Sequence, residues 1–269
     1  MVSIWVVLLF SLLGGVLSLI GGFILLADKK RARLLAKYAT PFAAGALLAA
    51  AFTDLLSEAG ERGDYEVGLR FALFGILIFF VLEKFLHWFH HHHEHEDDNS
   101  DVGASLVIIG DTFHNFIDGV AIAAGFLVDV NTGMIVTLAV AAHEIPQEIG
   151  DFGLLLQKGL SRKKVLLVNV ASAMATAVAA VLFFAIGQQI DIPLDAVLGL
   201  VAGFFIYIAS SDIIPTIHEE KSKQIGTLQA VLLLLGALTV GLTTSYLHQY
   251  IEVEDSHDNE AQYIEVHSD

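Results

Sequence analysis

The sequence contains no cysteine and is poor in proline, tryptophan and charge. Of its 269 residues, none is Cys, four are Pro, two are Trp and only 16% are charged. The absence of cysteine excludes disulfide bonds and thiolate ligands, so any metal site must use nitrogen and oxygen atoms. A soluble domain carries about 25% charged residues. The chain therefore has too little polar surface to cover a soluble globule.

The sequence is instead rich in hydrophobic residues, which form long apolar segments. Hydrophobic residues make up 55% of it, and the mean hydropathy is +0.67. This composition excludes a soluble enzyme, a nucleic-acid binder and a disordered tail protein, and it predicts an integral membrane protein in contact with the lipid bilayer. The uncharged segment 1–27 is too long for a signal peptide and lacks a basic start, so we expect it to form the first transmembrane helix.

Eight segments have the length of about 20 residues that a membrane-spanning helix needs. They are 3–27, 38–60, 68–89, 104–127, 132–157, 165–188, 194–217 and 226–248. Pro41 is expected in the first turn of the second helix, and Pro193 at the entry to the seventh. We predict an all-α fold with eight transmembrane helices, forming one transporter domain over 1–250. An acidic, extracytoplasmic and disordered tail is expected over 251–269.

The basic residues predict the orientation. Twelve of the 14 lie in the connections after the first, third, fifth and seventh spans, and only Arg62 and Arg70 lie on the opposite side. Cytoplasmic connections carry the excess of Lys and Arg. Both termini are therefore expected outside the cytoplasm, in the cell (inner or plasma) membrane, and the His-rich loop 87–100 inside it.

Two spans of opposite direction share a short pattern. Ala44-Gly45 precedes Asp54 in the second span, and Ala202-Gly203 precedes Asp212 in the seventh at the same spacing. Inverted repeats of this kind are the ground plan of many alternating-access carriers. The pattern predicts an inverted repeat that relates the first and last three helices.

Polar residues are concentrated in two short windows of the spans 104–127 and 132–157. Offsets of 0, 3, 4 and 7 place four side chains of the first window on one helical face, namely Asp111, His114, Asn115 and Asp118. In the second window one stripe carries His143, Gln147 and Asp151, and the adjacent stripe carries Glu144 and Glu148.

The energetic cost of these residues indicates a cation. A carboxylate at mid-bilayer costs about 2.5–3.5 kcal/mol on insertion scales, so Asp118, Glu144 and Glu148 facing lipid would cost on the order of 10 kcal/mol. Neither span contains Lys or Arg to neutralise them. A single buried histidine often serves only as a hydrogen-bond partner between helices. Seven polar residues at matching depths, three within 114–118 and four within 143–148, instead favour a bound divalent metal.

Histidine nitrogens with carboxylate and amide oxygens suit Zn(II), Fe(II) and Mn(II). We expect a first site made by His114, Asp118, His143 and Gln147. Asn115 and Glu144 are turned by about 100° from these stripes and are expected to form a second, adjoining site.

The motifs HNFIDG (114–119) and HEIPQEIGD (143–151) resemble the signature of the ZIP family (Zrt-, Irt-like proteins) of divalent metal transporters. The resemblance implies a binuclear mid-membrane site, with Gln147 able to bridge its two metals and Asn169 in contact with the second. It also implies a possible homodimer, and a motion of the first, fourth, fifth and sixth spans against the others. The sequence departs from the family at Gln147, where relatives carry His or Glu.

Further polar residues outline a transport pathway. Asp54 and Glu58 are expected to attract metal at the outer side, and Asp111, Asp151 and Asp212 to receive it at the inner side; Glu148 is a further candidate. Helix capping is the alternative role for each. In the His-rich loop the candidate metal ligands are His90, His91, His92, His93 and His95.

The sequence therefore predicts a carrier that imports a divalent transition metal, with zinc first and iron or manganese as alternatives, and with no organic cofactor. A metal-gated channel or sensor is the alternative function. An intramembrane zinc protease is a further one, because His143-Glu144 begins an HExxH-like string. Gln147 replaces the second histidine of that string and Pro146 interrupts its helix, so an enzyme is not expected.

Overall fold

The computed structural model describes residues 2–93 and 100–266. Side chains are described for most of these residues, but not for 86–103, for 247–266 or for a few single positions that include Asp212. Every regular element in the described part is a helix, as the composition predicts. The predictions for the His-rich loop residues His90–His95 and for the tail 251–269 fall on undescribed side chains and stay predictions.

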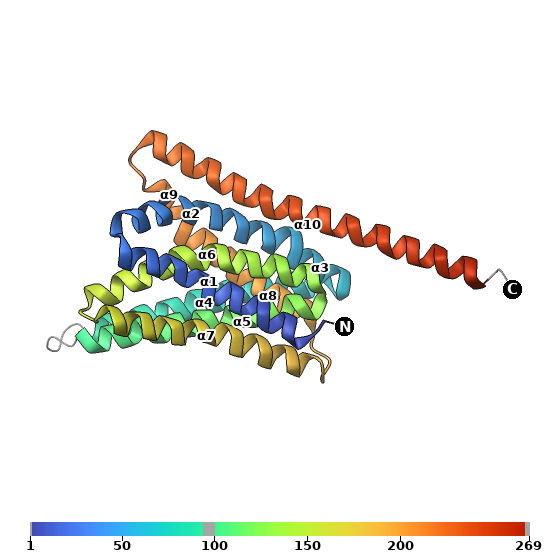
Figure 1. Cartoon of the computed structure of the whole chain (residues 1–269), viewed down its shortest axis with the longest axis horizontal. Coiled ribbons are helices and arrows are strands. Elements are labelled where there is room, and N and C mark those ends of the chain that lie inside the picture. Colours follow the sequence, from blue (N-terminus) through green and yellow to red (C-terminus); the bar gives the residue numbers. More distant parts are fainter. Residues whose placement is uncertain (1, 94–99, 267–269) are drawn as a thin grey trace.

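Long helices run side by side in one bundle (Figure 1). They are α1 (Ile4–Ala27), α2 (Lys29–Ala49), α4 (Tyr65–His93), α5 (Ser100–Val128), α6 (Val130–Gln157), α7 (Arg162–Gly187), α8 (Leu194–Tyr207) and α10 (Lys223–Val266). Short segments extend two of them: η1 (Ala50–Leu55) and α3 (Leu56–Arg62) follow α2, while η2 (Ile208–Ile213) and α9 (Ile214–His218) follow α8.

In the described part of the chain, seven helices are long and apolar enough to cross a membrane. The expected span 132–157 is not among them, although its helix α6 has 28 residues. The polar residues that lower the hydropathy of α6, among them His143, Glu144 and Glu148, are buried inside the bundle. The count of eight transmembrane helices thus depends on whether α6 is included.

Single aspartate residues connect two pairs of consecutive helices and cap the second helix of each pair. Asp28 alone joins α1 to α2, and its carboxylate accepts hydrogen bonds from the amides of Lys30 and Arg31. Asp129 joins α5 to α6 in the same way and caps the amide of Thr132. These carboxylates satisfy amides at the helix start, which allows a reversal of direction within one residue.

The connections gather at two ends of the bundle. In Figure 1 the turns α1–α2, α6–α7 and α9–α10 lie at the left end, while the N-terminus and the α7–α8 connection lie at the right. Most of the basic residues lie in or near these three turns, and Lys37 of α2 forms an ion pair of 2.7 Å with Glu220 of the α9–α10 turn. That contact also lowers the pKa of the Glu220 carboxyl below its usual range.

The prediction that Pro41 lies in the first turn of the second helix is wrong. Helix α2 begins at Lys29, so Pro41 lies in its interior. The apolar stretch of the sequence begins later than the helix, because the Asp28 cap starts the helix within the basic segment before that stretch. Pro193, in contrast, stands immediately before α8, as predicted.

Two π-helical turns were not predicted. Segments η1 and η2 interrupt α2 and α8, and at their ends the amides of Leu56 and Ile214 bond to the carbonyls of Ala51 and Ala209, five residues earlier. Segment η2 begins 158 residues after η1 begins and ends 158 residues after η1 ends, which is also the spacing between Asp54 and Asp212. π-Turns are frequent at functional sites.

Glycines bring the outer helices into close contact in two similar pairs. A Cβ added at Gly45 would collide with the backbone of α10, and one at Gly236 with the backbone of α2. The same holds for Gly203 of α8 against α4 and Gly75 of α4 against α8. Small residues allow membrane helices to approach to backbone contact. These pairs fix α2 to α10 and α4 to α8.

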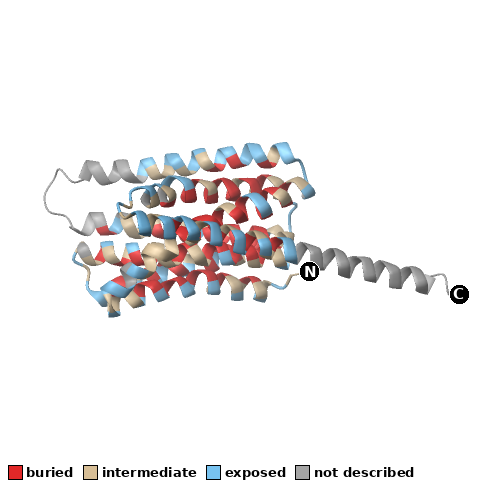
Figure 2. Ribbon diagram, turned by 90° about the horizontal axis from the view of Figure 1, so that it is seen from above, coloured by how far each residue is buried: buried red, intermediate tan, exposed pale blue. Residues whose placement is uncertain are grey.

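Burial separates the inside of the bundle from its perimeter (Figure 2). The large side chains Phe126, Phe152, Phe184 and Phe205 are at most 2% exposed, whereas exposed leucines and phenylalanines line the outer faces of the helices. An apolar perimeter fits contact with lipid. The buried polar residues of α5 and α6 lie within this interior.

Candidate metal centre

Helices α5 and α6 bring four ligand-bearing side chains together. One ligand atom from each of His114, Asp118, His143 and Glu144 lies within 4.8 Å of every other. The two imidazole Nε2 atoms are 3.1 Å apart, and Asp118 Oδ2 lies 3.3 Å from Nε2 of His143 and 3.8 Å from Nε2 of His114. Glu144 Oε1 lies 3.5 Å from Nε2 of His114. The predicted approach of the two polar windows is observed.

These separations fit one small cation. Nitrogen and oxygen ligands bind Zn²⁺ at about 2.0–2.2 Å in a tetrahedral arrangement, which places neighbouring ligand atoms roughly 3.3–3.6 Å apart. Four of the six distances between these ligand atoms, 3.1, 3.3, 3.5 and 3.8 Å, bracket that range, and the other two are at most 4.8 Å. The four residues therefore converge on a volume of the size of a metal ion.

The histidine rings are held by their surroundings. Nδ1 of His143 lies 3.0 Å from the carbonyl oxygen of Ala139 in the preceding turn. If Nδ1 carries the proton, Nε2 is left as the atom that can bind a cation. Phe79 of α4 stands edge-on to His114, and Phe205 of α8 stands edge-on to His143. Aromatic rings from outside helices thus limit the rotation of both imidazoles.

Most carboxylate oxygens in and beside the centre lack a hydrogen-bond donor in the described structure. Within the described part of the chain, Asp118 Oδ2 and both carboxylate oxygens of Glu144 and Glu148 are buried and accept no hydrogen bond. Buried carboxylates without donors are strongly disfavoured unless a proton or a cation compensates them. The chemistry of the site therefore favours positive charge.

Asn115 is linked to α7 as well as to its own helix. Its Nδ2 donates to the backbone oxygen and to Oδ1 of Asp111, at 3.1 and 3.0 Å, and its Oδ1 accepts a hydrogen bond of 2.8 Å from Thr176 Oγ1. A flipped amide would place its oxygen against the two oxygens of Asp111, so the network fixes this orientation.

Sequence reasoning missed the polar stripe of α7 that supports this network. Besides Asn169, the stripe contains Ser172, whose hydroxyl donates to Thr112 Oγ1 at 3.2 Å, and Thr176. All three are at most 2% exposed. Spacings of three and four residues in the sequence were the signal that could have identified them.

The other predicted ligands of the centre are placed less closely. Asn169 is buried, its Nδ2 donates to the carbonyl of Val165, and its Oδ1 has no hydrogen-bond partner among the described residues. Gln147 is half-buried one turn after His143 and takes part in none of the described hydrogen bonds. Glu144, expected in the second site, lies with the residues of the first.

The pathway candidates lie on several elements. Asp54 is buried in η1 with neither oxygen hydrogen-bonded in the described structure, and Glu58 is buried one turn later in α3. Asp111 is buried and bonded to Asn115, whereas Asp151 of α6 is half-buried. None of these residues belongs to the cluster of four.

Comparisons with known proteins place the chain in a family. The sequence profile of a family described as ZIP Zinc transporter matches residues 1–105 and 90–244. Zinc transporter ZIP13 of Pongo abelii is 33% identical over 217 residues, which are 74% of this chain and 63% of that protein. Zinc transporter ZIP4 of Mus musculus is 40% identical over 120 residues, 44% of this chain and 18% of that protein.

Zinc transporter ZIP10 of Danio rerio is 36% identical over 121 residues, which are 45% of this chain and 14% of that protein. The matched region thus spans less than two thirds of each of these relatives. The family profile, by contrast, covers most of this chain, including both helices of the metal centre. The chain is an integral membrane protein that belongs to the ZIP zinc transporter family.

Proposed function

We propose that this chain imports a divalent transition-metal cation into the cytoplasm by alternating access, with zinc as the first candidate cargo and iron or manganese as alternatives. The ion is held by His114, Asp118, His143 and Glu144, and Gln147, Asn115 and Asn169 complete or adjoin the site. No organic cofactor is involved.

The observation that carries the proposal is the buried cluster of two imidazoles and two carboxylates between α5 and α6. Within the described part of the chain, Asp118 Oδ2 and both carboxylate oxygens of Glu144 accept no hydrogen bond, and the ligand atoms are spaced for one small cation. Because Asp118, His143 and Glu144 are buried and His114 is half-buried in a lipid-facing bundle, the ion must be reached through the protein. A mid-membrane site of this kind is what alternating access requires.

Two features of the fold support a carrier with an inverted repeat. The π-turns η1 and η2 recur at the same spacing as Asp54 and Asp212, and matching glycine pairs join α2 to α10 and α4 to α8. We propose eight transmembrane helices including α6, with both termini outside the cytoplasm. In this arrangement Asp54 and Glu58 receive metal at the outer side, and Asp111, Glu148 and Asp151 pass it inward.

The proposal is tested by metal uptake into proteoliposomes that contain the purified chain. Zinc uptake should saturate and should be competed by the ions that the site accepts among iron, manganese and cadmium. His143→Ala should reduce uptake at least tenfold, because it removes one of four ligands. His218→Ala, which changes an exposed histidine of α9, is the matched control and should leave uptake unchanged.

The variant without 90–95 separates the centre from the His-rich loop and should retain most of the uptake. Equal losses in His143→Ala and in this variant would contradict a transport site between α5 and α6. The alternative function, a metal-gated channel or sensor, predicts uptake that does not saturate, or metal binding without uptake.

A further inference from the structure

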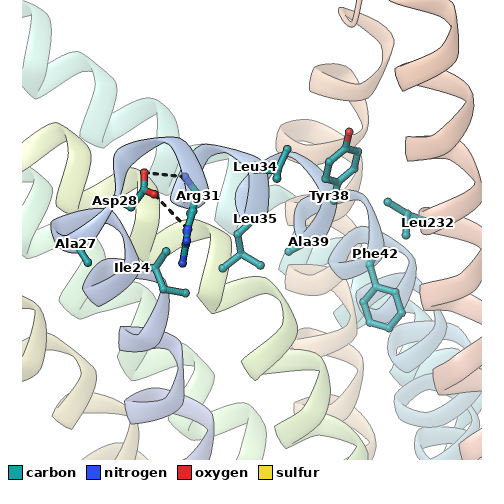
Figure 3. Close-up of a pocket in the computed structure, with 10 residues that line it drawn as sticks. All are labelled: Ile24, Ala27, Asp28, Arg31, Leu34, Leu35, Tyr38, Ala39, Phe42 and Leu232. Carbon is teal, nitrogen blue, oxygen red and sulfur yellow. Dashed lines mark hydrogen bonds and ion pairs between the residues drawn. The ribbon is translucent and has the colours of Figure 1, made fainter.

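A groove lies outside the metal centre, at the end of the bundle that carries the basic residues. Its volume is about 710 Å³, within the range of about 300–1,000 Å³ that small-molecule sites occupy. The C-terminal end of α1, the first turns of α2 and one residue of α10 enclose it (Figure 3). It shares no residue with the cluster of four.

The groove has one charged end and an apolar remainder. Arg31 and Asp28 stand at one end, while Leu35, Phe42 and Leu232 line the length that leads away from them (Figure 3). An apolar channel with a single charged end matches an amphiphile, in which a long apolar chain follows one polar group. A hydrated metal ion or a polar metabolite would find few partners along these walls.

The charged end favours an anion. The carboxylate of Asp28 is already engaged, since it accepts from the amides of Lys30 and Arg31 and lies 3.3 Å from Nε of Arg31. The two terminal nitrogens of the guanidinium make no ion pair in the described structure, and the Arg31 side chain is 83% exposed. Lys29 and Lys30 add two more exposed cations beside it.

We propose that this groove binds an anionic phospholipid, with the phosphate at Arg31 and one acyl chain lying along α2 toward α10. Basic pockets between membrane helices on the side rich in Lys and Arg are suited to anionic headgroups. The apolar side chain of Leu34 is 57% exposed next to Arg31, which is costly in water but favourable against an acyl chain. The lipid would bridge the α1–α2 turn and α10.

Native mass spectrometry of the full-length chain, titrated with phosphatidylglycerol or phosphatidylcholine in detergent, tests the proposal. The chain should retain phosphatidylglycerol in preference to phosphatidylcholine. Arg31→Gln should reduce that preference about fivefold, the effect expected for one basic residue at an anionic lipid. Arg162→Gln is the matched control, because it removes an exposed arginine at the same end of the bundle but outside the groove.

Variants of the groove wall separate a lipid site from general charge attraction. Ala39→Phe fills the groove and should abolish retention of both lipids, and Leu34→Gln should weaken it without adding volume, which covers the case in which Ala39→Phe misfolds. Equal effects of Arg31→Gln and Arg162→Gln would overturn the proposal. Unchanged lipid retention in both wall variants would also overturn it. A dimer that only the wall variants dissociate would overturn it as well, since a second copy of the chain would then occupy the groove.

Discussion

Thr176 of α7 offers the sharpest test of how the structure holds the metal centre. Its hydroxyl donates a hydrogen bond of 2.8 Å to Asn115 Oδ1, and the residue is fully buried. Thr176→Val keeps the shape of the side chain and removes only the donor. The Asn115 amide then loses the contact that fixes its oxygen side, while its Nδ2 remains on Asp111.

The expected magnitude follows from this geometry. One buried hydrogen bond contributes about 1 kcal/mol, and leaving a buried acceptor unsatisfied costs about 1–3 kcal/mol. Changes to residues that orient metal ligands typically lower metal affinity about 10–100-fold, or roughly 1.4–2.7 kcal/mol. We therefore expect Thr176→Val to weaken zinc binding about tenfold or more while the fold persists.

Zinc titration of the purified variant by calorimetry measures this effect. The matched control is Thr137→Val in α6, a buried threonine that donates only to the carbonyl of Gly133 in its own helix, at 2.7 Å. The control should lose stability without losing zinc affinity. If both variants bind zinc equally well, or if Thr176→Val changes only stability, Asn115 is not oriented for the metal by α7.

Three further predictions concern ligand strength, orientation and packing. Gln147→His should tighten zinc binding by roughly 1–2 kcal/mol and slow maximal uptake. The loss of zinc affinity at acidic pH should become steeper, because imidazole must be neutral to bind the metal. Zinc titrations that stay unchanged across pH would show that Gln147 is not a ligand. A single cysteine at Asp258 should react with an impermeant thiol reagent on intact cells and one at His92 should not, in a chain without native cysteine; labelling at His92 would reverse the orientation. Gly203→Ala should lower the melting temperature because its Cβ meets the backbone of α4, whereas Gly241→Ala, with nothing within 4 Å, should not; equal melting temperatures would refute the close packing.

The helices and the two polar windows were predictable from the sequence because they rest on local patterns. Apolar length identifies the helices that lie in lipid, and offsets of three and four residues identify the shared face of His114 and Asp118. Matching depths in two helices then predict that this face meets His143. Each of these steps uses only residues within one helix, or a comparison of the depth of polar residues in two helices.

The start of α2 at Lys29 was predictable as well, because the Asp28 cap is a local signal that the apolar stretch further on obscured. Other features have no local signal in the sequence, and the π-turn at Asp54 is one of them. Glu144 joins the first set of ligands because of the relative rotation of α5 and α6. The support from Thr176 arises in a third helix, 61 residues from Asn115.

Zinc X-ray absorption spectroscopy of the metal-loaded chain tests the central claim most directly. The sample is the variant that lacks 90–95, so that the five histidines of that stretch contribute no scattering. We predict two imidazoles and otherwise oxygen ligands at about 2.0–2.2 Å from the zinc, and one imidazole after His143→Ala. An imidazole count that stays the same after that substitution would contradict a metal centre formed by His114, Asp118, His143 and Glu144.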